Sequence, residues 1–76
     1  MVVRKSDGSY EEFDRKKLSN IVKKTFKSAG ITCDEDCVKE IVDSLYIYDG
    51  IMCSSIRKQL QERFSERNEE LLIAYL

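Results

Sequence analysis

Two lysines near the start of the chain have the type and spacing to bind an anion. Lys5 stands just before the turn signal Asp7-Gly8, and Lys17 falls in the first turn of an expected helix. A hairpin in this segment would bring both ammonium groups to one edge, beside the free N–H groups of a helix N-terminus. Ammonium groups and N–H donors suit the oxygens of a di- or triphosphate, which can only accept hydrogen bonds.

Two carboxylates belong to the same stretch. Glu11 and Asp14 could accept hydrogen bonds from the hydroxyls of a sugar, although they would repel phosphates placed beside them. Neither Gly-x-x-x-x-Gly-Lys-Ser/Thr nor Gly-x-Gly-x-x-Gly occurs, so both standard phosphate loops are missing. The residues alone leave two interpretations open: a plain hairpin, since Asp-Gly turns are common, and a lid over a nucleotide.

Composition narrows the class of protein. A chain of 76 residues predicts a single domain over 1–76 with a small core. Its 13 basic and 14 acidic residues give a net charge of −1, which argues against nucleic acid as a partner. No apolar run approaches the roughly 20 residues that span a bilayer, so we expect no membrane partner and a cytoplasmic location. Because histidine, the commonest general base, is absent, a self-contained enzyme is not expected.

The chain has three cysteines, Cys33, Cys37 and Cys53. An odd number without a secretory signal argues against a disulfide framework. Without histidine, a zinc site would lack ligands, so we expect no metal. Buried or half-buried thiols are the expectation.

A hairpin and a first helix are predicted from the first thirty residues. Val2 and Val3 pair with residues 10–13 across the turn at 6–9. Asp14 is a good N-cap, and Gly30 offers a C-terminal stop. Apolar positions recur at helical spacing between them: Leu18, Ile21, Val22, Thr25, Phe26 and Ala29.

A second helix is predicted from the capping-box spacing of Thr32 and Glu35. We expect it to end near the turn signal at 48–50. Its apolar positions are Val38, Ile41, Val42 and Leu45.

Two more helices complete the expected layout. Cys53, Ser54 or Ser55 could cap a helix that runs from Ser54 to about Glu66. Asn68 can cap a last helix that continues to Leu76. The third helix has apolar positions at Ile56, Leu60 and Phe64. The predicted fold class is α+β, mostly helical: a four-helix bundle capped by an N-terminal β-hairpin or small sheet.

Two segments resemble a known family. The run Val3-x-Lys5-x-Asp7-Gly8-x-x-Glu11-x-Phe13-Asp14-x-x-Lys17-Leu18 resembles the opening signature of the ATP-cone family. The segment Tyr48-Asp49-Gly50-Ile51-x-Cys53-Ser54-x-Ile56 resembles cones at the N-terminus of ribonucleotide reductase large subunits, and residues 71–76 resemble the family's last helix. The resemblance covers essentially the whole chain.

The resemblance implies a regulatory nucleotide site in which ATP switches an enzyme on and dATP switches it off. The cone would have no chemistry of its own. It would be the N-terminal part of a longer reductase chain, an oxidoreductase, and its partners would be the rest of the large subunit and the oligomer. Magnesium would accompany the nucleotide.

Site residues follow from the same resemblance. Val3 would line the adenine or backbone side, and Lys5 and Lys17 would contact phosphates. Glu11 and Asp14 would lie beside the base or sugar. Two more residues would lie near the ligand: Cys53, where the reductases often have Thr, and Arg57, where some have His.

Two alternatives stay open. Ser6 stands where the family has an Arg, and a hydroxyl does not replace a bidentate guanidinium. The chain could therefore be a degenerate cone that serves as a helical interaction module. It could also be the cone of a transcriptional repressor that couples a cone to a zinc ribbon and controls reductase genes.

Overall fold

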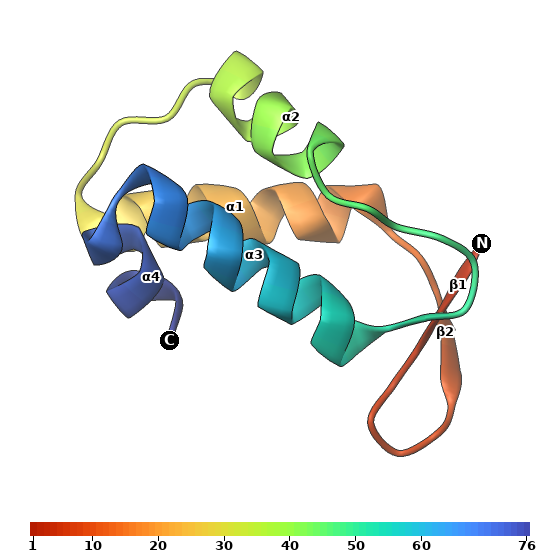
Figure 1. Cartoon of the computed structure of the whole chain (residues 1–76). Helices are drawn as coiled ribbons and strands as arrows, with labels where there is room; N and C mark the ends of the chain where they lie inside the picture. Colours follow the sequence, from red (N-terminus) through yellow and green to blue (C-terminus); the bar gives the residue numbers. More distant parts are fainter.

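The computed structural model describes residues 1–76, which form four helices and a three-stranded sheet (Figure 1). The strands are β1 (Val2–Arg4), β2 (Tyr10–Glu12) and β3 (Ile51–Met52). The helices are α1 (Arg15–Ala29), α2 (Glu35–Asp43), α3 (Cys53–Arg67) and α4 (Glu69–Tyr75). The expected α+β class, mostly helical with a small sheet near the N-terminus, is confirmed.

The helices pack around α1. Figure 1 shows α3 alongside α1, α2 on one side of this pair, and α4 folded back at the end that lies opposite the sheet. Helix α1 contacts both α2 and α4, and α3 contacts α4. No helix combines the length and the apolar character that a membrane crossing requires.

The hairpin turn forms where Asp7-Gly8 predicts it. The Gly8 N–H donates to the carbonyl of Lys5 at 3.0 Å, and Gly8 has a φ of 89°, which glycine adopts without strain. The Asp7 carboxylate accepts from the hydroxyl of Ser9 at 2.6 Å and from its N–H at 2.9 Å. Both hydrogen bonds lower the pKa of Asp7, and the one from the Ser9 hydroxyl has the larger effect.

A third strand joins the hairpin, and its position was not anticipated. Strand β3 pairs in parallel with β1, with Ile51 opposite Val3, so the sheet order is β2-β1-β3. The backbone of Val2 is held from both sides: its N–H donates to Asp49 Oδ1 at 2.7 Å, and its carbonyl accepts from the Gly50 N–H at 2.8 Å. Ile51 is 1% exposed. This segment therefore fixes the start of α3 against the hairpin.

Helix α1 has the caps that the sequence predicts. The Asp14 carboxylate accepts from the N–H of Lys16 at 2.9 Å. Gly30 has a left-handed φ of 71° and donates to the carbonyl of Lys27 at 3.1 Å. Four of the expected apolar positions are buried: Leu18, Val22, Thr25 and Phe26. Ile21 is 41% exposed and Ala29 is half-buried, so the buried stripe is narrower than the spacing predicts.

Three helix ends differ from the prediction. The N-cap of α2 is Asp34, whose carboxylate accepts a hydrogen bond from the N–H of Cys37 at 2.8 Å. The predicted capping box that begins at Thr32 is therefore wrong. Helix α2 ends at Asp43 and not near 48–50, because the chain must leave the helix to reach β3. The capping of α3 by Cys53, Ser54 or Ser55 is also wrong. Its N-cap is Met52, the last residue of β3, and no side chain caps it.

The C-terminal end of α3 and the N-cap of α4 agree more closely with the prediction. Helix α3 ends at Arg67, one residue beyond the expected Glu66. The Asn68 side chain accepts from the N–H of Glu70 at 2.9 Å and caps α4 as predicted. Helix α4 ends at Tyr75.

One buried cluster joins all four helices: Leu18, Val22, Phe26, Val38, Ile41, Val42, Leu45, Leu60, Phe64 and Leu71. The expected burial of the apolar positions in the second helix is confirmed, as is that of Leu60 and Phe64. Phe26 and Phe64 meet edge to face with their centroids 6.3 Å apart. Ile56 is only partly buried, because it lies at the edge of the cluster.

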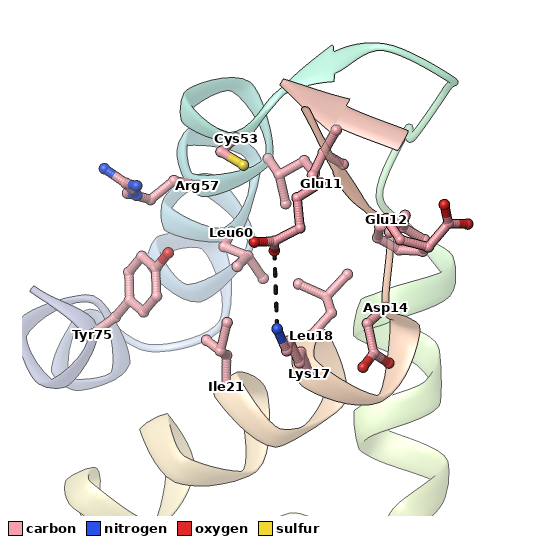
Figure 2. A pocket seen from close by; sticks show the side chains of 13 residues that line it. Glu11, Glu12, Asp14, Lys17, Leu18, Ile21, Cys53, Arg57, Leu60 and Tyr75 are labelled. Atoms are coloured by element: carbon pink, nitrogen blue, oxygen red, sulfur yellow. Dashed lines mark ion pairs between the residues drawn. The ribbon is translucent and has the colours of Figure 1, made fainter. Parts of the chain in front are cut away.

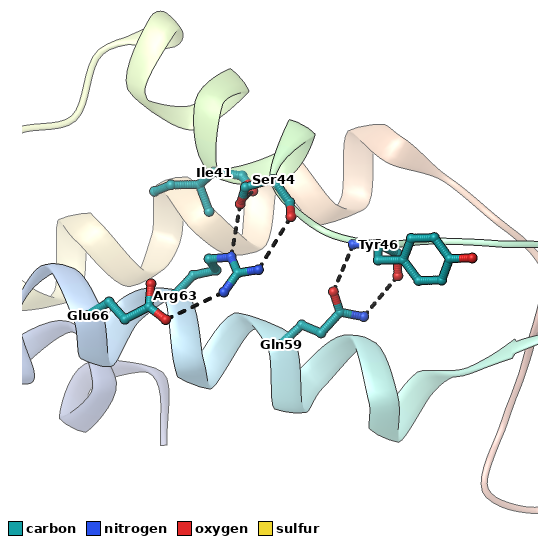
Figure 3. Close-up of polar contacts among 6 residues, drawn as sticks. All are labelled: Ile41, Ser44, Tyr46, Gln59, Arg63 and Glu66. Atoms are coloured by element: carbon teal, nitrogen blue, oxygen red, sulfur yellow. Dashed lines mark hydrogen bonds and ion pairs between the residues drawn. The ribbon is translucent and has the colours of Figure 1, made fainter.

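Side chains of α3 hold the loop between α2 and β3 (Figure 3). The Gln59 amide accepts from the N–H of Tyr46 at 2.8 Å and donates to its carbonyl at 2.9 Å. Arg63 donates to the hydroxyl of Ser44 at 3.2 Å and pairs with Glu66 at 3.6 Å. These contacts fix the course of the chain from the end of α2 to β3.

The Asp49 hydrogen bond is expected to contribute measurably to stability. Asp49→Ala leaves the Val2 N–H without its partner and should lower the free energy of unfolding by about 1 kcal/mol. In a domain of this size that corresponds to a fall of roughly 4–8 °C in Tm. Asp49→Asn keeps an acceptor oxygen and should retain most of the stability.

Thermal unfolding followed by circular dichroism measures both variants. Glu62→Ala, which removes an exposed carboxylate of α3 that makes no ion pair, is the matched control. An unchanged Tm for Asp49→Ala would contradict the role given to this hydrogen bond.

Candidate functional site

A pocket of about 230 Å³ lies where the sheet meets α1, α3 and α4 (Figure 2). Its apolar lining comes from β1, the link between β2 and α1, and helices α1 and α3: Val3, Phe13, Leu18, Ile21, Ile56 and Leu60. The remaining lining residues are polar, aromatic or sulfur-containing: Glu11, Glu12, Asp14, Lys17, Cys53, Arg57 and Tyr75. An apolar wall with a few convergent polar groups is typical of small-molecule sites.

The structure brings the seven candidate site residues together. Six of them line the pocket: Val3, Glu11, Asp14, Lys17, Cys53 and Arg57. Lys5 is not a lining residue, but its ammonium lies 3.4 Å from the carboxylate of Glu11. The predicted approach of Lys5 and Lys17 to one edge is confirmed, and the part that each residue plays in binding stays a prediction.

The register of the hairpin aims Glu11 at the pocket. Glu11 lies opposite Val3 in the antiparallel pair, so the two side chains point to the same face of the sheet. Val3 is 5% exposed, which identifies that face as the inner one. Figure 2 shows the Glu11 carboxylate directed toward Lys17, and that of the next residue, Glu12, directed away.

The acidic groups of the site have different partners. Glu11 pairs with two cations, through Oε2 with Lys5 at 3.4 Å and through Oε1 with Lys17 at 3.9 Å. The carboxylate of Glu12 lies 3.4 Å from the N-terminal ammonium. Asp14 caps α1. Glu11 is therefore the acidic group that pairs with both Lys5 and Lys17.

Tyr75 belongs to the pocket, although sequence reasoning placed it only on an apolar helix. Its ring packs against Phe64 with the centroids 5.3 Å apart. Burial raises the pKa of the Tyr75 phenol, an effect that the guanidinium of Arg57 opposes. Figure 2 shows its oxygen directed toward α3. The residue type could have indicated this position, because the hydroxyl of a buried Tyr usually faces a hydrogen-bond partner or an open site.

All three cysteines are free and half-buried, as expected. Only Cys53 lines the pocket. Burial and the neighbouring thiol of Cys37 raise the pKa of Cys33 to about 12. No three His, Cys, Asp or Glu side chains are grouped in a way that could hold a metal ion.

An apolar pocket beside ammonium and guanidinium groups fits the class of small domains that bind an organic anion. The family model of the ATP cone domain matches residues 1–76, so the chain belongs to the ATP-cone family. ATP cones are regulatory domains that bind ATP or dATP as effectors and do not catalyse a reaction. No curated protein and no solved structure matches the chain.

The raised pKa of Cys33 predicts a slow reaction with alkylating agents. A thiol whose pKa rises from 9.0 to about 12 is only about one part in a thousand thiolate at pH 9. Iodoacetamide at pH 9 should therefore leave Cys33 almost unmodified in the folded chain and modify it readily in urea. Mass spectrometry of the digested protein measures the difference.

The raised pKa of Cys33 also predicts that the free energy of unfolding falls as the pH rises above 9. The proton binds more tightly to Cys33 in the folded state, so this contribution to stability is complete below pH 9 and is lost as the pH rises from 9 toward 12. The variant Cys33→Ser should lack this part of the alkaline loss. Equal labelling of Cys33 in the folded and unfolded chains would contradict the account.

Proposed function

We propose that this chain is the domain through which ATP and dATP regulate the large subunit of a ribonucleotide reductase. The observation that carries the proposal is that Lys17 and Arg57 line one pocket, and that Lys5 pairs with Glu11 of the same lining, in a chain of the ATP-cone family. The segment Tyr48–Ile56 supports the reductase as parent, because its sequence resembles that of the reductase cones.

In the proposed complex the pocket holds part of the nucleotide. Ligand pockets usually have volumes of about 300–1,000 Å³, and this one, at about 230 Å³, suits a base with its sugar better than a whole nucleotide. Val3 would form the wall, and Glu11 and Asp14 would lie beside base or sugar. The phosphates, with Mg²⁺, would extend to the exposed ammonium groups of Lys5 and Lys17.

Arg57 offers a cation that partly replaces the one missing at Ser6. It lines the pocket from α3 and pairs with no carboxylate of the chain. A guanidinium can bind a phosphate through two parallel hydrogen bonds. We therefore assign Arg57 to the phosphates, and Cys53, at the start of the same helix, to the wall beside them.

The domain would act by differential affinity. A ligand that touches the sheet, α1, α3 and α4 at once can favour one arrangement of these elements over another. ATP and dATP would thereby stabilise different assembly states of the large subunit, and reduction of ribonucleotides for deoxyribonucleotide synthesis would take place elsewhere in the parent chain. The partners would be the rest of that subunit and its oligomer.

Calorimetric titration with ATP and with dATP in magnesium buffer tests the proposal. We expect saturable binding of both, with different affinities. Lys5→Ala and Lys17→Ala should each weaken binding by about tenfold or more, because a hydrogen bond to a charged group contributes roughly 1.5–3 kcal/mol. The Tm without ligand should hardly change, since the side chains of Lys5 and Lys17 are 49% and 70% exposed.

Lys39→Ala, an exposed lysine of α2 away from the pocket, is the control and should bind like the wild type. Absence of heat and of a thermal shift at millimolar nucleotide would overturn the proposal. That result would favour the degenerate cone, in which the helices serve only as an interaction module.

A further inference from the structure

Glu11 already places an anion between the two lysines of the site. Its Oε2 lies 3.4 Å from the Lys5 ammonium, and its Oε1 lies 3.9 Å from that of Lys17. Each carboxylate oxygen thus faces one ammonium group, and Figure 2 shows the Lys17 contact inside the pocket. In the unliganded site, Glu11 therefore pairs with both lysines at once.

The fold makes this arrangement specific to Glu11. Its position opposite Val3 directs it to the inner face of the sheet. Glu12, one residue further, pairs with the N-terminal ammonium and is 78% exposed. Asp14 accepts from the Lys16 N–H as the cap of α1. Three carboxylates line the pocket, and of these only Glu11 pairs with Lys5 and Lys17.

We infer that Glu11 is an internal counter-ion that competes with the ligand's phosphates for Lys5 and Lys17 and so lowers the affinity of the site. The inference rests on the proposed function, because it assigns the two lysines to phosphates. A phosphate that reaches both ammonium groups competes with Glu11 for them and brings a second anion beside the Glu11 carboxylate. The carboxylate therefore opposes the binding of an anionic group to both lysines.

This competition has a use in a domain that senses concentration. The carboxylate holds both lysine side chains near the pocket before the ligand arrives, which reduces the ordering that binding requires. It also keeps the affinity low enough for the ligand to leave when its concentration falls. Glu11 would thus set the concentration range over which the domain responds.

Titration with inorganic tripolyphosphate isolates the effect, because this probe has neither base nor sugar that Glu11 could contact. Wild type, Glu11→Gln and Glu12→Gln are compared by calorimetry, with and without Mg²⁺, and ATP is titrated into each. Each variant loses one negative charge, so the two have the same net charge and differ only in which carboxylate is removed. Gln keeps the size of Glu, and Glu11 is 43% exposed, so the fold should stay intact, which the Tm checks.

We expect Glu11→Gln to bind tripolyphosphate about three- to tenfold more tightly than the wild type, since two exposed ion pairs are removed from the competition. Glu12→Gln should change the affinity by less than about twofold, because its partner is the N-terminus and the charge is exposed and screened.

Unchanged or weaker tripolyphosphate binding by Glu11→Gln would overturn the inference, and so would an equal gain in Glu12→Gln. A loss seen only with Mg²⁺ would also overturn it, since the carboxylate would then serve a metal ion. In each of these cases wild-type binding of ATP would leave the proposed function standing. If no form of the protein binds ATP or tripolyphosphate, both the inference and the proposed function fail.

Discussion

The pairing of β1 with a strand on each side holds the two halves of the site together. On one side β2 carries Glu11 and leads into α1 with Lys17, and on the other β3 leads directly into α3 with Cys53 and Arg57. An isolated two-stranded hairpin is marginal in water, so the third strand and the packing of Val3 and Ile51 are what make the sheet a stable wall. Asp49 and Gly50 fasten that strand through the backbone of Val2.

The bundle supplies the rigid part of the domain, and the site lies at its edge. The buried cluster extends through all four helices, whereas the charged groups beside the pocket are accessible to solvent. Tyr75 connects the two regions, because it lines the pocket and packs against Phe64 in the core. A ligand at such a place can be exchanged without unfolding the core, and it can still affect the position of α4.

The parts of the fold that depend on near neighbours could be predicted from the sequence. The turn at Asp7-Gly8 and the caps of α1 are set by residues within a few positions of one another, and both were predicted correctly. Strand β3 could not be found in this way, because two residues give no periodic signal and the strand exists only through its pairing with β1. The Thr32 cap was wrong because Asp34, two residues later, caps α2 instead.

Sequence predicted those residues of the candidate site that lie close together in the chain or belong to a segment that resembles a known family. Tyr75 was missed as a pocket residue because only the packing of α4 brings it there. The double pairing of Glu11 was also missed. It depends on the register of the hairpin and on the direction of α1, which place Lys5 and Lys17 on either side of one carboxylate.

The most direct measurement is a nitrogen-15 NMR titration of the folded chain with MgATP, which reports on every backbone N–H at once. We expect saturable shift changes concentrated at the pocket, with α2 (Glu35–Asp43) nearly unaffected; the residues expected to shift are Val3, Glu11, Lys17, Cys53, Arg57 and Tyr75. Shift changes centred on α2, or none at millimolar MgATP, would contradict the claim that the hairpin and the bundle enclose a nucleotide site.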